Sequence, residues 1–305
     1  MAGIKEYASV ARAPFLLLPP TLIASGAAAA AWANGFSWSR TLLALIGLVA
    51  LHMAVDILNE WSDMRTGIDL HTERTPFSGG SGTLPAGGMS PRAALVYGLV
   101  CAAVGLVIGV WFLREVGWVL LPIILAGAVC VLAYTDVLAR LGIGEMAAGF
   151  GLGAGPVIGA ALVQNGNWSL AAVAASVPAF FMTFNLLLLN EFPDEAADRE
   201  GGRRNLVILL GRRPAAWIYA IAGIATPLGI IVAVLFHVLP PLCLFAALPS
   251  LLLIKPLQWV VSDPSSPVPI PALGANVVWN LATNTAMAMA LVADLLFDWI
   301  PLLQS

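Results

Sequence analysis

The sequence predicts an all-α membrane protein, a polytopic bundle of about nine transmembrane helices. The chain has 305 residues, of which 60% are hydrophobic and only 10% are charged. Soluble domains contain roughly 45–50% apolar and about 25% charged residues, so this composition is typical of membrane proteins. Apolar runs of about 20 residues, the length that a transmembrane helix needs, recur along the whole chain.

Each of these apolar runs is expected to cross the bilayer. They are residues 13–33, 40–60, 93–113, 117–138, 143–164, 168–191, 214–236, 238–261 and 270–297. The first run is long enough to span and is followed by more spans, so we expect it to be retained rather than removed as a signal peptide. We expect residues 1–305 to form a single transmembrane domain with two pseudo-repeated halves.

The positions of Lys and Arg predict the orientation of this bundle. With nine spans, all but two of the 14 basic residues fall on the side that holds the N-terminus, and the exceptions are Arg40 and Arg114. Basic residues accumulate in cytoplasmic loops. We therefore expect an integral protein of a bacterial inner membrane with a cytoplasmic N-terminus. The two long polar connections, 61–92 and 192–213, then also face the cytoplasm.

Two acidic segments close the second and sixth predicted helices. The first holds Asn59 and Asp63, four residues apart, and the second holds Asn190, Asp194 and Asp198 at the same interval. Residues four apart share one face of a helix. An ionisable residue at membrane depth is costly and by default functional. The alternative is two solvated helix ends, but the matching spacing on one side of the membrane favours a site.

The two segments also match each other in sequence. NEWSD at 59–63 and NEFPD at 190–194 share an Asn-Glu-aromatic-x-Asp pattern, which predicts equivalent helix ends that face one another. Converging carboxylates repel unless a cation joins them. Mg²⁺ takes oxygen ligands, and it typically uses one or two carboxylates together with substrate phosphates. The pair of segments therefore predicts a site for Mg²⁺ and a diphosphate.

Other polar or small residues leave two interpretations open. Arg residues follow both acidic segments and serve either phosphate binding or anchoring at the cytoplasmic surface. The SGGSG stretch at 78–82 is expected to be a flexible loop. Asn276, Asn280 and Asn284 are expected to hydrogen-bond between helices. The glycines within 149–159 either leave room for a polyprenyl tail or permit close helix packing.

On these residues the sequence resembles the UbiA superfamily of intramembrane aromatic prenyltransferases, over about the whole chain. The family's Asn-Asp-x-x-Asp motif corresponds to 59–63, and its Asp-x-x-x-Asp motif corresponds to 194–198. The continuation REGGRRNLVILLGR is similar to the branch that prenylates 1,4-dihydroxy-2-naphthoate. Two departures stand out: Glu60 replaces the usual Asp, and Arg203-Arg204-Asn205 replaces the usual Lys-x-Thr.

The resemblance implies Mg²⁺-dependent transfer of a prenyl group from an isoprenyl diphosphate to an aromatic small molecule, within the lipid bilayer. The implied metal ligands are Asn59, Glu60, Asp63, Asn190, Asp194 and Asp198. The implied catalytic residues are Asp63, Asp194 and Asp198. The implied diphosphate-binding residues are Arg12, Arg65, Arg199, Arg203, Arg204 and Tyr134.

Several alternatives to this reading differ in acceptor or in class. Within the family, the expected acceptor is 1,4-dihydroxy-2-naphthoate, and the alternatives are 4-hydroxybenzoate, homogentisate and a chlorophyllide. A secondary transporter also has repeats and polar midplane residues, but here the acidic residues crowd one face. An alcohol phosphatidyltransferase is disfavoured because no single Asp-rich run with an embedded Ala-Arg pair is present. Nucleic acid is not an expected partner, since no basic stripe with interleaved aromatics appears.

Overall fold

The computed structural model describes residues 2–33, 35–72 and 74–298, and within them every regular element is a helix. In this part of the chain, eight helices are long and apolar enough to cross a membrane, and one bent pair raises the number to nine. The predicted polytopic all-α bundle is therefore confirmed. The uninterrupted spanning helices are α3 (Trp38–Thr66), α5 (Pro91–Val116), α10 (Leu170–Glu200), α12 (Arg212–Leu235) and α14 (Ile270–Asp298).

The remaining spans combine shorter helical pieces. There are four of these: η1 with α2 (Ala13–Leu17, Leu18–Trp32); η2 and α6 (Trp118–Leu120, Leu121–Leu132) joined across a bend to η3 and α7 (Tyr134–Leu138, Ala139–Leu141); α8 with η4 and α9 (Gly144–Gly149, Phe150–Ala154, Gly155–Asn165); and η5 with α13 (Pro241–Leu253, Ile254–Ser262). Three short helices, α1 (Ile4–Val10), α4 (Ile68–His71) and α11 (Leu206–Leu210), lie outside the spans. All of these pieces keep backbone hydrogen bonds within the chain, as the interior of a bilayer requires.

The fourth predicted span, 117–138, is not one straight helix. It bends by 70° between Leu132 and Tyr134. The turn that follows is a π-helix, in which the Leu138 N–H bonds to the Ala133 carbonyl at 2.9 Å. A π-turn widens the helix locally and often marks a functional position. The bend itself was not predicted, because a run of apolar residues carries no signal for it.

The fifth span contains a second irregular turn, and a neighbouring helix compensates for it. Pro156 has no N–H, so the Leu152 carbonyl one turn earlier loses its usual donor. Thr183 on α10 supplies the replacement, because its Oγ1 donates to Leu152 O at 2.8 Å. Within membranes, a freed carbonyl of this kind is commonly satisfied by a Thr side chain of another helix. This contact fixes the fifth span against α10.

Both acidic segments lie entirely on helices, as their spacing predicts, including the parts that fall within the predicted polar connections 61–92 and 192–213. Helix α3 continues to Thr66, and α10 continues to Glu200, several residues beyond the predicted ends of the spans. Helix α3 stops at Gly67, whose φ of 84° is the left-handed conformation that glycine adopts without strain. Polar residues extend a helix freely once it leaves the bilayer, so the apolar run underestimates its length.

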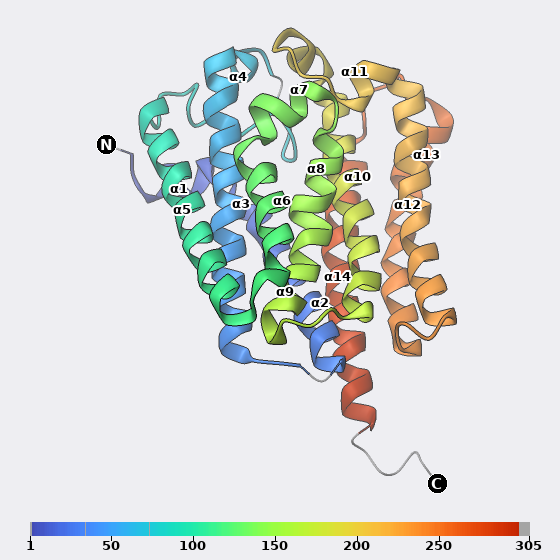
Figure 1. Cartoon of the computed structure of the whole chain (residues 1–305). Coiled ribbons are helices and arrows are strands. Elements are labelled where there is room, and N and C mark those ends of the chain that lie inside the picture. Colours follow the sequence, from blue (N-terminus) through green and yellow to red (C-terminus); the bar gives the residue numbers. More distant parts are fainter. Residues whose placement is uncertain (1, 34, 73, 299–305) are drawn as a thin grey trace.

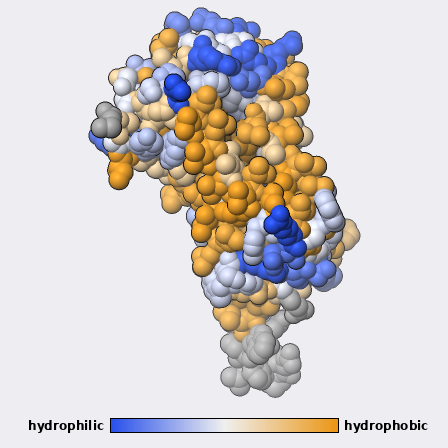
Figure 2. Space-filling view, turned by 60° about the vertical axis from the view of Figure 1, so that its left-hand side comes forward, coloured by the Kyte–Doolittle hydropathy of each residue, from blue (hydrophilic) through white to orange (hydrophobic). Residues whose placement is uncertain are grey.

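The connecting elements gather at one end of the bundle. Figure 1 shows α4, α7 and α11 at the same end, while α14 runs to the opposite end. Figure 2 shows a broad hydrophobic band between hydrophilic regions. Large apolar side chains of the spanning helices, such as Leu106 and Val107 of α5 and Ile221 of α12, are more than half exposed. An apolar surface of this extent fits lipid, so the chain is an integral membrane protein.

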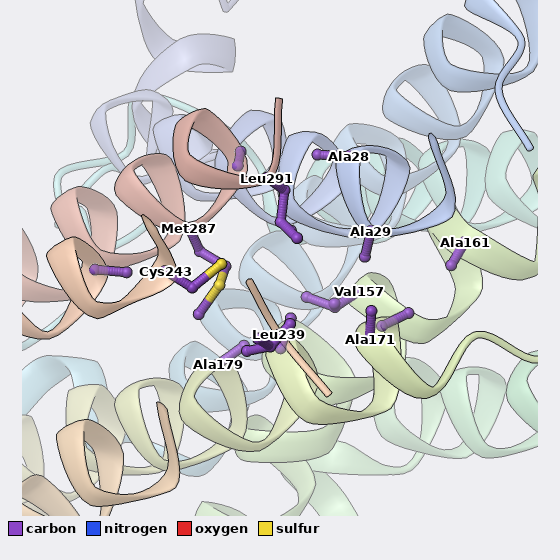
Figure 3. Packing of buried hydrophobic residues seen from close by; sticks show 14 of the residues in the cluster. Ala28, Ala29, Val157, Ala161, Ala171, Ala179, Leu239, Cys243, Met287 and Leu291 are labelled. Carbon is purple, nitrogen blue, oxygen red and sulfur yellow. The ribbon is translucent and has the colours of Figure 1, made fainter. Parts of the chain in front are cut away.

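Small side chains form the core. Figure 3 shows Ala28 and Ala29 of α2 near Val157 and Ala161 of α9, with further alanines from α10. In a bilayer, close backbone approach replaces the hydrophobic effect as the source of helix association. The closest approach lies at Gly26 of α2, where an added Cβ would come within 2.2 Å of the Val157 carbonyl oxygen.

Two of the three asparagines of the α14 stripe bond between helices, as predicted, whereas Asn284 donates within α14 to Asn280 Oδ1 at 2.8 Å. Asn276 Nδ2 donates to the Asn185 carbonyl at 3.1 Å and its Oδ1 accepts from Tyr219 at 3.0 Å. Asn280 Nδ2 donates to Thr183 Oγ1 at 3.3 Å. These bonds join α14 to α10 and α12.

We expect Gly26→Ala to lower the free energy of unfolding by roughly 1–3 kcal/mol, the usual cost of overpacking, because the new methyl group meets backbone that cannot move aside. Thermal unfolding in detergent measures this. The matched control is Gly127→Ala on α6, where an added Cβ has no neighbour within 4 Å. Equal melting temperatures for the two variants would contradict the packing described here.

Candidate active site

The two acidic helix ends face one another across a polar cavity of about 90 Å³. On α3, Asn59 Nδ2 donates to Asp63 Oδ2 at 3.0 Å, which holds both side chains on one face. On α10, successive turns present Asn190, Asp194 and Asp198 to the same cavity. The spacing of four residues therefore has the predicted effect. It places one row of polar side chains from α3 and one from α10 on the walls of the polar cavity.

Arg203 joins the two rows at the top of the cavity. Its guanidinium bonds to Asp63 on α3, and its Nη1 donates to Asp198 Oδ1 on α10 at 3.1 Å. Asn205 Nδ2 donates to the other Asp198 oxygen at 2.9 Å. The residues Asp63 and Asp198 are 7% and 2% exposed, so solvent contributes little to balancing their charge. The positive charge of the Arg203 guanidinium offsets the free-energy cost of burying these two carboxylates.

Electrostatics keep Arg203 charged. Burial on its own lowers the pKa of the guanidinium, but Asp63 and Asp198 outweigh burial and raise the pKa above its ordinary value. Removing either carboxylate would leave a buried charge without its partner, which is strongly destabilising. Arg203 reaches this position because the chain turns at Gly201 and Gly202 directly after α10.

The loop that contains the SGGSG stretch closes one side of the polar cavity, and it is anchored rather than free. Ser81 donates to the two oxygens of Glu60, from its N–H at 2.6 Å and from its Oγ at 2.5 Å. The Gly79 N–H donates to Asp194 Oδ2 at 3.3 Å. The expectation of a flexible loop is therefore wrong, and a carboxylate from each acidic row holds the loop. Since both oxygens of Glu60 already accept hydrogen bonds, Glu60 acts here as the anchor of this loop.

Nine of the predicted site residues line the polar cavity together. They are Arg12, Asn59, Glu60, Asp63, Tyr134, Asn190, Asp194, Asp198 and Arg203. Arg12 comes from the turn before η1, and Tyr134 comes from the bend of the fourth span. The sequence therefore located residues from five separate elements that meet at one cavity.

Three predicted diphosphate-binding residues, Arg65, Arg199 and Arg204, do not line this cavity. Arg65 pairs with Asp136 at 3.2 Å and stacks over Trp61. Arg199 pairs with Glu195 one turn earlier on α10 at 3.0 Å. The backbone N–H of Arg204 donates to the Ala139 carbonyl of α7 at 2.9 Å. A position near an acidic motif does not fix the direction of a side chain. Arg199 directly follows Asp198 on α10, so the helical period turns its side chain away from the polar cavity.

Two acidic residues of the cavity were missed. Glu191 on α10 is 8% exposed, and its position in NEFPD is equivalent to that of Glu60 in NEWSD, so the internal repeat could have indicated it. Asp69 on α4 is 3% exposed. Burial, together with the neighbouring carboxylates of Asp63 and Glu60, raises the pKa of the Asp69 carboxyl to about 7. A cation in the cavity would favour the charged form of this group.

The donor set of the cavity fits Mg²⁺. Among the described residues that line this cavity, three buried carboxylate oxygens have no hydrogen-bond partner: Asp69 Oδ2, Glu191 Oε2 and Asp194 Oδ1. In the part of the chain that the structure describes, no three acidic, His or Cys side chains converge closely enough to form a complete metal cluster. Mg²⁺ does not need one, because it keeps waters and commonly completes its shell with substrate phosphates. The carboxylate and amide oxygens here are ligands of the type that such an ion takes.

Below the polar cavity lies a central cavity of about 190 Å³. Arg12, Asn59, Tyr134 and Asn190 line both, so the two spaces are continuous. Most of the other residues around the central cavity are apolar, from α2, α3, α6, α8 and α10. A ligand can therefore place a charged group in the polar cavity and an apolar body in the central cavity.

A third space, the side cavity, measures about 430 Å³ and meets the central cavity at Leu48, Leu51, Gly127, Val131 and Gly151. Its wall is formed largely by apolar residues of α3, α5, α6, η4 and α9. Together the three cavities form one path from a polar end into an apolar interior.

The glycines of the fifth span divide between the two roles expected for them. Gly151, Gly155 and Gly159 line the side cavity. Gly149 and Gly153 instead press against α10, where an added Cβ on Gly153 would come within 2.5 Å of a backbone oxygen. Close helix packing is therefore confirmed for Gly149 and Gly153, whereas a polyprenyl tail beside Gly151, Gly155 and Gly159 stays a prediction.

The fold and these cavities define a class: an integral membrane protein with a buried acidic site at one end of an apolar cavity. The chain belongs to the UbiA prenyltransferase family, whose model matches residues 17–282. It is therefore a prenyltransferase, as the paired motifs predict.

Several curated proteins are similar in sequence to this chain over part or nearly all of its length. The chain is 26% identical over 301 residues to the 1,4-dihydroxy-2-naphthoate octaprenyltransferase of Mycobacterium leprae, covering 95% of this chain and 98% of the relative. It is 27% identical over 299 residues to the enzyme of the same name from Mycobacterium tuberculosis, covering 94% and 98%. The match to the Bacillus subtilis enzyme of that name is 25% identical over 182 residues and spans 57% of its length.

Solved structures confirm the fold. A UbiA homolog from Aeropyrum pernix K1 gives a TM-score of 0.67 at 18% identity, covering 90% of this chain and 98% of the other. A UbiA homolog from Archaeoglobus fulgidus, solved with GPP and Mg²⁺, gives 0.65 at 15% identity, covering 93% and 99%.

We expect Ser81→Ala to loosen the loop that Glu60 anchors, because one of two hydrogen bonds to this carboxylate is lost. Hydrogen bonds to charged groups contribute roughly 1.5–3 kcal/mol, so trypsin should cleave after Arg74 at least several-fold faster. Ser90→Ala is the control, since Ser90 only caps α5. Equal cleavage rates in Ser81→Ala and the unmodified protein would show that the anchor has no role in ordering the loop.

Proposed function

We propose that this prenyltransferase moves a prenyl group from an isoprenyl diphosphate to 1,4-dihydroxy-2-naphthoate or a closely related aromatic acceptor, with Mg²⁺ as cofactor. The observation that carries the proposal is the pair of acidic helix ends facing each other above an apolar cavity. The names of the full-length mycobacterial relatives support the acceptor. The Archaeoglobus homolog solved with GPP and Mg²⁺ supports the donor and the metal.

The residues divide into metal-binding and phosphate-binding groups in this proposal. Asn59, Asp63, Asn190, Asp194 and Asp198 supply oxygen ligands for Mg²⁺. When bound, the ion would stabilise the negative charge that develops on the departing diphosphate.

The guanidinium of Arg203 lies between the carboxylates of Asp63 and Asp198, and Arg12 lines the same cavity. We infer that these two bind the diphosphate oxygens, since Arg matches phosphate geometry with paired donors. Tyr134 lines the passage between the polar and central cavities. There it would contact the reacting end of the prenyl group.

The reaction breaks the bond between the allylic carbon and the diphosphate oxygen, and the electron pair leaves with diphosphate. An aromatic carbon of the acceptor supplies the electron pair of the new C–C bond. The ring then regains aromaticity by breaking another bond at that carbon, which releases a proton from a C–H carbon or CO2 from a carbon that bears a carboxylate. The chain contributes position and the exclusion of water, because an allylic cation exposed to water would be hydrolysed. The acidic rows fix one end of the donor while the apolar cavity holds the acceptor within reach.

The orientation also belongs to this proposal. We infer that α4, α7 and α11 face the cytoplasm of a bacterial cell, because basic residues concentrate at this end. A water-soluble diphosphate head then enters from the cytoplasm while the apolar tail stays in the membrane.

The proposal is tested by incubating the purified protein in lipid nanodiscs with octaprenyl diphosphate and 1,4-dihydroxy-2-naphthoate. We expect Mg²⁺-dependent release of diphosphate together with a prenylated product by mass spectrometry, and neither after EDTA. Parallel reactions with 4-hydroxybenzoate and homogentisate test the acceptor. Product from one of these and none from the naphthoate would reassign the acceptor, and no product with any would overturn the proposal.

Asp63→Asn and Asp198→Asn are each expected to lower kcat roughly 100-fold or more, because a site of preorganised charge is broken. The substitutions keep side-chain shape, so that loss of activity is separated from loss of packing. Asp263→Asn, an exposed acid at the end of α13, is the control and should retain normal turnover. Near-normal rates in either site variant, with normal insertion, would sink the two-row assignment.

The side cavity predicts a dependence on chain length. Gly127→Phe should leave turnover of geranyl diphosphate unchanged but lower that of octaprenyl diphosphate roughly 10-fold or more, because the ring closes the passage for a long tail. Gly229→Phe on α12, which lines none of the three cavities, is the control. An equal loss with both donors would mean that the tail leaves by another route.

A further inference from the structure

A buried His–Asp pair in the wall of the central cavity has no place in the reaction described so far. His52 and Asp56 lie one turn apart on α3, with His52 Nε2 3.5 Å from Asp56 Oδ2. His52 is 5% exposed, and both residues line the central cavity. Together with Asn59 and Asp63 they continue one polar face of α3 from the acidic site into the membrane.

The pair is not satisfied by the protein. Among the described residues, neither His52 Nδ1 nor Asp56 Oδ2 has a hydrogen-bond partner, although both atoms are buried. Leaving a polar atom buried without a partner costs roughly 1–3 kcal/mol, and more for a charged group. A carboxylate at membrane depth without a partner is retained for function by default. The unsatisfied atoms therefore indicate a ligand that completes them.

The surroundings define what this ligand is. Apart from the pair, the polar side chains lining the central cavity are Arg12, Asn59, Tyr134, Thr183, Asn190 and Asn280. Two arginines line the polar and central cavities. Arg203 forms ion pairs with Asp63 and Asp198, whereas Arg12 forms none with the acidic rows. The rest of the wall is apolar. Such a space takes a flat apolar body that carries a hydrogen-bond donor toward Asp56.

We propose that His52 and Asp56 form the recognition site for a ring hydroxyl group of the aromatic acceptor. The hydroxyl donates to the Asp56 carboxylate, and His52 holds the carboxylate in place from the neighbouring turn. This inference rests on the proposed function, and it adds which atoms of the chain orient the acceptor. Asp56 lies seven residues below Asp63 along α3, a rise of about 10 Å. The hydroxyl is thereby held below the diphosphate, with the ring between them.

The test pairs a change in the protein with a change in the ligand. Binding of 1,4-dihydroxy-2-naphthoate, 1-hydroxy-2-naphthoate and 4-hydroxy-2-naphthoate is measured by equilibrium dialysis, with the protein in nanodiscs and octaprenyl thiodiphosphate and Mg²⁺ present. The unmodified protein should bind the dihydroxy compound roughly 10-fold or more tightly than at least one of the others, as one hydrogen bond to a charged group implies. Asp56→Ala should bind all three alike.

His52→Gln separates recognition from structure. Its amide can still support Asp56, so it should keep most of the discrimination, whereas His52→Leu should lose it. Asp294→Ala on α14 is the matched control, because Asp294 is an intramembrane acid paired with Trp32 at 3.0 Å outside the central cavity. It should discriminate as the unmodified protein does.

The inference is overturned if the unmodified protein binds the three naphthoates within about 2-fold of one another, a result that needs no variant to fold. It is also overturned if Asp56→Ala discriminates fully. Binding is measured without turnover, so these results stay separate from a failure of prenyl transfer itself. Absence of product together with hydroxyl-dependent binding would reject the proposed function and keep the recognition site.

Discussion

The arrangement of the site depends on one interaction, the Arg203 guanidinium held between Asp63 of α3 and Asp198 of α10. Two rows of buried acidic side chains repel each other, and at this depth water does not screen the repulsion. A cation between them is the condition under which both helix ends can stay close. Arg203 meets this condition, because its guanidinium pairs with a carboxylate of each row.

A consequence follows for ligand binding. In the proposed function the carboxylates of both rows would hold Mg²⁺, and Arg203 would then bind phosphate oxygens of the diphosphate. The same residue would then serve two partners in turn, carboxylate before binding and phosphate after it. This exchange keeps buried charges paired throughout, which a site that assembled from unpaired carboxylates would not. It also gives a role to the Arg that departs from the family's usual Lys.

Irregular backbone builds the rest of the path. The π-turn at Tyr134–Leu138 bends the fourth span by 70° and brings Tyr134 to the junction of the polar and central cavities. The π-turn before Pro156 places Gly151 at the entrance of the side cavity. Within a membrane such breaks persist only where other groups satisfy the backbone, as Thr183 does for Leu152. The apolar path therefore depends on polar contacts between helices.

Sequence reasoning identified the features that follow from local spacing. Apolar runs predicted the spans, and the interval of four residues placed Asn59 with Asp63 and Asp194 with Asp198. It could not predict contacts set by tertiary approach. The pairing of Arg65 with Asp136 depends on the bend of the fourth span, and the anchoring of Glu60 by Ser81 depends on how a loop folds back. His52 and Asp56 have the same i, i+4 spacing as the motif, but their significance appears only when a cavity lies beside them.

The central claim is that a metal ion and a diphosphate bind between the two helix ends and displace Arg203 from the carboxylates. It is tested most directly by a cryo-EM structure of the protein in nanodiscs with Mn²⁺ in place of Mg²⁺ and octaprenyl thiodiphosphate. We predict metal density flanked by Asp63 and Asp198, with Arg203 turned toward the phosphate groups. A diphosphate bound elsewhere, or bound while Arg203 still joins Asp63 to Asp198, would contradict the account.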